Sequence, residues 1–89
     1  MATDEELSIV LSKAELTLLK KCNFPCSDKV LATAQLTEEG YEVFGSWSEF
    51  DSLAGWVAGE ANHSRGARRI ALLESIFEQL DFVTSCRQR

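Results

Sequence analysis

The sequence predicts a mostly helical α+β domain, and three observations carry this prediction. Segments 7–11 and 41–44 have the composition and spacing of β-strands. Each is followed directly by a helix-start signature. Two further segments have apolar residues at helical spacing. The predicted order is therefore β-α-α-β-α-α, with four helices and two short strands.

The first strand and helix come from LSIVLSKAELTLLKKC, residues 7–22. Apolar residues alternate with others from Leu7 to Leu11, which is the two-residue period of a strand. Ser12 and Glu15 then form the capping box S-x-x-E, so a helix should begin at Ser12. The helix should end before Pro25, because the residue preceding a proline avoids the α conformation.

A second helix is predicted after Ser27 or Asp28, with its apolar residues within 30–34. Either side chain can accept hydrogen bonds from the first turn of a helix. Gly40 fits the position just past the end of this helix, where glycine is favoured.

The strand-and-cap signature returns 34 residues later, with Ser46 and Glu49 as a second capping box. The same shift of 34 residues aligns Val43 with Ile9 in the sequence. This spacing is consistent with an internal duplication into half-repeats 7–40 and 41–83, although helix starts reuse the same caps without common ancestry.

The last two predicted helices run from the second capping box to about Ala61 and from about Ala67 to Val83, followed by a tail, 84–89. The whole of 1–89 has the length of one small domain.

The two strands should pair with each other, with Ile9, Leu11 and Val43 facing the helices. A two-stranded sheet has two open edges, and open edges invite pairing with another chain. We therefore expect either a dimer or a protected edge.

Charge and hydropathy argue against several classes of protein. No apolar run approaches the roughly 18 residues of a membrane span, and the acidic start MATDEEL is unlike a signal peptide. We therefore expect a soluble, cytoplasmic protein without membrane contact. The net charge of −5 disfavours nucleic-acid binding. Residues 1–60 are net acidic and residues 61–89 net basic, an asymmetry that favours self-association.

Cys22, Cys26, Cys86 and His63 together would suffice for a zinc site. The C-x₃-C spacing is unusual for zinc, however, and no second close pair is present. Cys22 continues an apolar helix face, where cysteine acts as a small hydrophobe. The sequence therefore favours no metal and no cofactor, and it shows no catalytic constellation.

Two glycines, Gly55 and Gly59, lie four residues apart inside the third helix, where each costs about 1 kcal/mol relative to alanine. Close packing within the molecule is the interpretation that we favour, and the approach of a partner is the alternative. Trp56 lies at the border of the apolar face, so it should be partly exposed and could anchor an interface.

The stretch EANHSRGARR, residues 60–69, contains the single histidine and three of the five arginines. Most of it reads as a turn: Asn62 or His63 ends one helix and Ser64 caps the next. Arg65, Arg68 and Arg69 exceed what a turn requires. They can converge at a helix start, where an anion or an acidic partner is favoured.

We therefore interpret the chain as a small binding or regulatory module that acts by protein–protein contact, with itself or with another protein. The alternative function is binding of a small anion or nucleotide phosphate through Arg65, Arg68 and Arg69.

Overall fold

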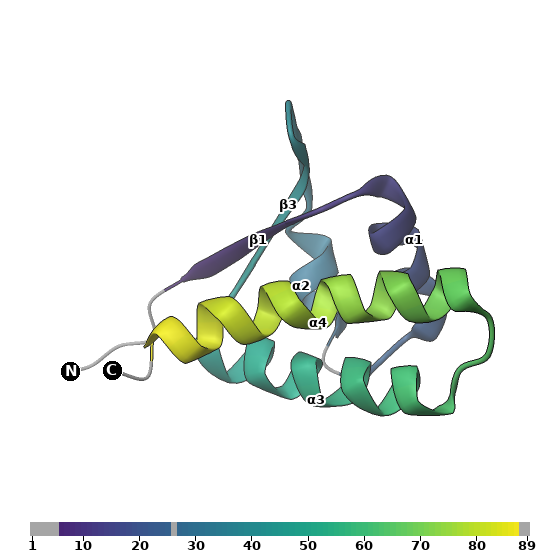
Figure 1. The fold of residues 1–89 in the computed structure, drawn as a ribbon. Helices are drawn as coiled ribbons and strands as arrows, with labels where there is room; N and C mark the ends of the chain where they lie inside the picture. Colours follow the sequence, from purple (N-terminus) through teal and green to yellow (C-terminus); the bar gives the residue numbers. More distant parts are fainter. Residues whose placement is uncertain (1–5, 26, 88–89) are drawn as a thin grey trace.

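The computed structural model describes residues 6–25 and 27–87, with the side chains of residues 86 and 87 outside the description. Within these residues the chain forms four helices and three strands, a mostly helical α+β fold (Figure 1). The elements in chain order are β1 (Leu7–Leu11), α1 (Lys13–Cys22), α2 (Ser27–Ala32), β2 (Gln35–Thr37), β3 (Gly40–Gly45), α3 (Trp47–His63) and α4 (Ala67–Arg87).

The predicted pairing of the two longer strands is confirmed. β1 and β3 are antiparallel, with Ile9 opposite Val43 and Leu11 opposite Tyr41. Ile9, Leu11 and Val43 are all buried. Side chains alternate between the faces of a strand, so this register turns the apolar residues of both strands toward the helices.

The prediction of two strands is wrong, because a third strand, β2, pairs with β3 and gives the sheet order β1-β3-β2. β2 occupies residues that we assigned to the end of the second helix. That helix ends at Ala32 instead. The Thr33 hydroxyl donates to the Val30 carbonyl at 2.6 Å and accepts the Phe44 N–H at 2.8 Å, which directs the following residues along β3.

Gly40 begins β3 rather than following a helix. Its φ is +145°, a conformation that L side chains rarely adopt. A Cβ at this position would also lie 2.7 Å from the Leu11 carbonyl oxygen. Glycine is therefore required here by the close passage of the β2–β3 turn over the end of β1.

Both predicted capping boxes are present. The Ser12 hydroxyl accepts the Glu15 N–H at 3.1 Å, and the Glu15 carboxylate accepts the Ser12 N–H at 2.9 Å. Ser46 and Glu49 form the same pair of bonds at the start of α3, at 3.2 and 2.9 Å. α1 and α3 therefore each start immediately after a strand of the sheet. The internal duplication stays a hypothesis.

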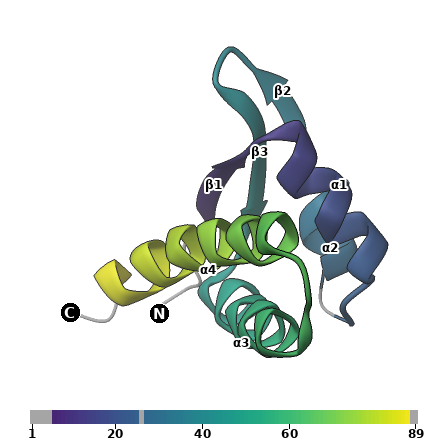
Figure 2. The ribbon, with the colours of Figure 1, turned by 45° about the vertical axis from the view of Figure 1, so that its right-hand side comes forward.

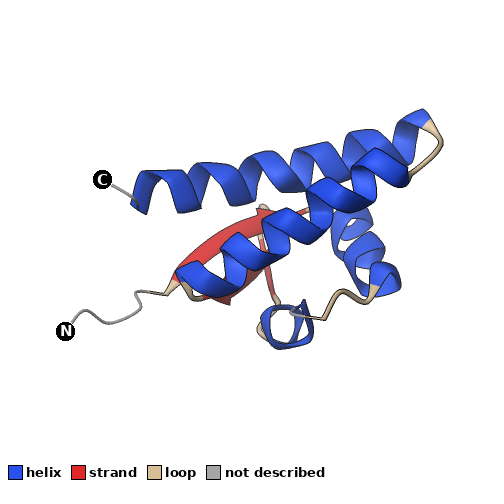
Figure 3. Cartoon of the chain, turned by 90° about the horizontal axis from the view of Figure 1, so that it is seen from below, coloured by secondary structure: helices blue, strands red, loops and turns tan. Residues whose placement is uncertain are grey.

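Helices α3 and α4 form an antiparallel pair beneath the sheet, while α1 and α2 lie beside it (Figures 1 and 3). The Trp47 indole N–H donates to the Thr84 carbonyl at 2.9 Å, which ties the start of α3 to the end of α4. α4 continues past Val83, its predicted end, to Arg87. The buried apolar residues come from β1, β3, all four helices and the α1–α2 connection and are Ile9, Leu11, Leu16, Leu18, Leu19, Phe24, Val30, Val43, Phe50, Leu53, Ala54, Val57, Leu73, Ile76 and Leu80.

Replacing Ser12 or Ser46 by alanine should lower the free energy of unfolding by about 1 kcal/mol each, because an N–H at the helix start loses its acceptor. Urea unfolding followed by circular dichroism measures the loss. The double variant should lose the sum, since the two caps share no partner. An unchanged midpoint for either single variant would contradict the stabilising role of that box.

Candidate functional site

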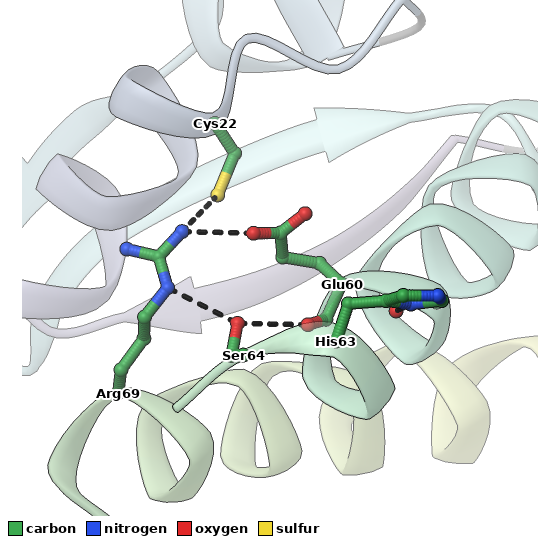
Figure 4. A network of polar contacts seen from close by, with 6 residues as sticks. Cys22, Glu60, His63, Ser64 and Arg69 are labelled. Carbon is green, nitrogen blue, oxygen red and sulfur yellow. Dashed lines mark hydrogen bonds and ion pairs between the residues drawn. The ribbon is translucent and has the colours of Figure 1, made fainter. Parts of the chain in front are cut away.

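Arg69, in the first turn of α4, is the centre of a polar network at the α3–α4 turn (Figure 4). Its Nη2 donates to the Glu60 carboxylate at 2.9 Å and contacts the Cys22 sulfur at 3.7 Å. Its Nε donates to the Ser64 hydroxyl at 3.1 Å, and that hydroxyl donates to the Glu60 carbonyl at 2.8 Å. One guanidinium therefore joins the ends of α1, α3 and α4.

This network makes Arg69 part of the scaffold. The hydrogen bond that Arg69 donates to the Glu60 carboxylate raises the pKa of Arg69 above its ordinary value, so the guanidinium stays charged. The two side chains are 39% and 35% exposed, so solvent screens the ion pair and its contribution to stability is modest. The acid that offsets one of the three arginines therefore comes from this chain.

Arg65 and Arg68 differ from Arg69 in being exposed. In the described part of the chain, neither makes a hydrogen bond or an ion pair through its side chain. Arg65 precedes α4, whereas Arg68 lies one helical turn before Leu72. Anion binding stays a prediction, and with Arg69 engaged it depends on these two residues.

His63 ends α3, as the turn interpretation requires, and its Nδ1–H donates to the Gly59 carbonyl at 2.9 Å. Figure 4 shows its ring turned away from Cys22 and Arg69. The expectation that Ser64 caps α4 is wrong. The Ser64 hydroxyl is used by Glu60 and Arg69, so it closes α3, and Gly66, with φ of +94°, leads into α4.

Cys22 is partly covered and packs against the core at the end of α1. Burial raises the pKa of its thiol, an effect that the nearby Arg69 only partly offsets. The neutral thiol is therefore favoured over a nucleophilic thiolate. The side chains of Cys26 and Cys86 lie outside the described residues, and among the described ones no three His, Cys, Asp or Glu residues gather to hold a metal.

The two glycines of α3 do not pack closely against another element, so the interpretation that we favoured for them is wrong. A Cβ on Gly55 or Gly59 would meet nothing within 4 Å. Trp56 between them is 48% exposed, as expected, and its ring stacks on Phe24 with centroids 6.2 Å apart. This side of α3 is therefore an open surface of small residues around one tryptophan.

The outer edge of β1 is a second open surface. Phe44 directs its N–H to Thr33, away from β1. In an antiparallel pair, the residue opposite must then direct its own N–H and C=O away from β3, and that residue is Ser8. Val10, two residues on, does the same. Among the described residues no hydrogen bond is made to these outward groups.

A groove of about 500 Å³ lies between this edge and the C-terminal half of α4. Phe82, on its α4 wall, is 67% exposed. The sequence-based prediction did not include Phe82, although its position outside the apolar row of α4 could have indicated that it is exposed. The groove is lined by Ser8, Ile9 and Val10 of β1 and by Ser75, Glu78, Gln79, Phe82 and Val83 of α4.

None of the helices in the described part of the chain combines the length and the apolar character needed to cross a bilayer.

The scaffold role of Arg69 predicts a contrast between two neighbouring arginines. Arg69→Ala should lower the thermal midpoint, because it leaves the half-buried Glu60 without its partner. Arg68→Ala removes the same charge from an exposed position and should leave the midpoint almost unchanged. Circular dichroism measures both variants. Equal midpoints would show that the network does not hold the three helix ends together.

Comparisons of the chain with protein-family models, with curated proteins and with solved structures give no match.

Proposed function

We propose that this chain is a protein-interaction module that binds an extended segment of a partner protein at the open edge of β1. The observation that carries the proposal is the position of the outward main-chain groups of Ser8 and Val10 beside the groove between β1 and α4. A peptide that joins a sheet edge gains main-chain hydrogen bonds, and pockets beside the edge select its side chains.

The walls of the groove define the side chain that fits. Ile9, Val10, Phe82 and Val83 make much of the lining apolar. The exposed Phe82 ring can close over an apolar side chain, and burying a ring of this size stabilises a complex by about 1.5–3 kcal/mol. We therefore expect an apolar residue of the partner at the centre of the contact.

One acidic residue lies in the groove beside this apolar centre. Glu78 is part of the lining, and Asp81 is the sequence neighbour of Phe82 on α4. Neither forms an ion pair within the described residues. Lysine or arginine near the apolar residue of the partner would complement Glu78 and speed association.

A displayed library of random peptides tests the proposal without a known partner. Peptides recovered on the chain should share an apolar residue with a basic residue near it. Phe82→Asp should weaken their binding about tenfold or more, because it replaces an apolar anchor by a charge that is costly to bury.

A matched pair of substitutions at Val10 tests the main-chain part of the contact. Val10→Pro removes one outward N–H, a change that an edge strand tolerates, and should weaken peptide binding about tenfold. Val10→Thr keeps both the N–H and the β-branched shape and should bind nearly as the parent does. Equal binding by the two variants, measured by calorimetry, would contradict strand addition at this edge.

The same variants test whether the extended segment comes from a second copy of this chain rather than from another protein. If no peptide is recovered, but the chain dimerises and Val10→Pro abolishes the dimer, the segment at the edge is β1 of a second copy. Recovered peptides whose binding ignores both Phe82→Asp and Val10→Pro would place the binding surface elsewhere and overturn the proposal.

A further inference from the structure

The turn of the β2–β3 hairpin projects away from the helices (Figures 1 and 2), and the hairpin carries an exposed apolar side chain. Leu36 in this hairpin is 73% exposed, more than Phe82 or Trp56. The leucine therefore adds little to the core, and most of its apolar surface is open to a partner.

The end of the hairpin is acidic. Glu38 and Glu39 form its turn, and Glu42 shares a hollow with them beside Thr37. Among the described residues the ion pair that forms joins Arg69 to Glu60. The three carboxylates of the hairpin therefore have no cationic partner in the part of the chain that is described.

A groove of the opposite character lies between α1 and α4, with a volume of about 540 Å³. Its apolar residues are Ala14 and Leu18 of α1 and Leu72 of α4. Lys13 and Lys21 line it as well, and they stand at opposite ends of α1. The groove is thus an apolar hollow flanked by two lysines, neither of which is engaged in an ion pair within the described residues.

We propose that the β2–β3 hairpin of one copy of this chain docks in the α1–α4 groove of a second copy. Leu36 would enter the apolar hollow, and Glu38 and Glu39 would approach Lys13 and Lys21. The hairpin projects away from the helices of its own chain, so the contact must join two copies. Hydrophobic burial supplies the attraction, and the opposite charges orient the two copies.

The contact is head-to-tail, because the hairpin and the groove are different surfaces. Each copy keeps a free hairpin at one end and a free groove at the other, so the assembly grows into a chain or closes into a ring. One leucine and a few ion pairs form a small interface, so we expect a dissociation constant on the order of 0.1 mM. Added salt should weaken the contact by screening the charges.

Dilution of the ¹⁵N-labelled protein from about 1 mM gives the first test, because most of it should be associated at that concentration. The amide signals that move should belong to the hairpin and to α1, and sedimentation velocity should show species larger than a monomer. A protein that stays monomeric across this range overturns the proposal.

Leu36→Asp blocks the hairpin and leaves the groove intact. Because the side chain is so exposed, the thermal midpoint should change little. Self-association should weaken about tenfold or more, since the apolar anchor is replaced by a charge. Gln35→Asp is the control, because it adds the same charge at the neighbouring exposed position and keeps the leucine. Association that is equally strong in both variants overturns the role of the leucine.

The double variant Lys13→Glu, Lys21→Glu blocks the groove and leaves the hairpin intact. Lys20→Glu, Lys29→Glu is its control, with the same change in net charge at two exposed lysines that do not line the groove. The groove variant should be monomeric where the control still associates. Association lost equally in both would show that only the overall charge matters and would overturn the docking site.

Mixing the two blocked variants is decisive for the head-to-tail geometry. The Leu36→Asp variant supplies only a groove, and the Lys13→Glu, Lys21→Glu variant supplies only a hairpin. Each alone should be monomeric, but together they should form a one-to-one complex that grows no further. A mixture that stays monomeric overturns the proposal. Ser8, Val10 and Phe82 are unchanged in all of these variants. A failure of the hairpin–groove contact would therefore not contradict peptide binding at the β1 edge, and a failure of peptide binding would not contradict the hairpin–groove contact.

Discussion

The antiparallel pairing of β1 with β3 is the constraint on which the rest of the structure depends. It sets Ile9 opposite Val43, so both side chains point into the core. A shift of one residue would turn either strand's apolar side chains to solvent. Each strand is followed at once by a capped helix, so the same register also fixes where α1 and α3 begin. The open edge beside the groove follows from it too, because β1 has a paired side and a free side.

The features that the sequence predicts well are those whose causes are local. Alternation over 7–11 and the two Ser-x-x-Glu boxes act within a few residues, and both appear in the structure as expected. β2 has a weaker local signal. It contains only Gln35–Thr37, and besides the hydrogen bonds of its own turn it is fixed by the Phe44 N–H, which donates to Thr33, and by the fit of Gly40 against the Leu11 carbonyl. The last two contacts join residues that lie farther apart in the sequence than the two ends of a helix cap.

The difference between local contacts and contacts remote in sequence also explains why the sequence could not separate Arg69 from Arg65 and Arg68. In the sequence, Arg65, Arg68 and Arg69 are three similar charges near a helix start. Arg69 is set apart by Glu60 at the end of α3 and by Cys22 of α1, which is remote in sequence. The division of the sequence into an acidic first part and a basic last part likewise takes no account of contacts between residues that are remote in sequence. It placed Lys13 and Lys21 in the acidic part, although they line a groove against α4 that carries no carboxylate.

The buried polar groups of the molecule are satisfied within the chain, whereas exposed apolar side chains and outward main-chain groups lie at its surface. The buried polar side chains have partners: Ser27 donates to the Phe24 carbonyl and Thr84 to the Leu80 carbonyl, and in the described residues no buried side-chain nitrogen or oxygen lacks a partner. The groups still open to solvent include the outward main-chain groups of the β1 edge and the exposed side chains of Phe82 and Leu36. Covering these exposed groups with a second molecule would remove further apolar surface from water and satisfy outward main-chain groups.

Amide hydrogen exchange along β1, measured by NMR on dilute protein, directly tests the pairing of β1 with β3 and the open edge on its other side. The exchange rates should alternate: the N–H groups of Leu7, Ile9 and Leu11 bond to β3 and exchange slowly, whereas those of Ser8 and Val10 point outwards and exchange fast. The opposite alternation would mean that the register is shifted by one residue. Uniformly slow exchange would mean that the edge is already covered, and either result would contradict an open β1 edge.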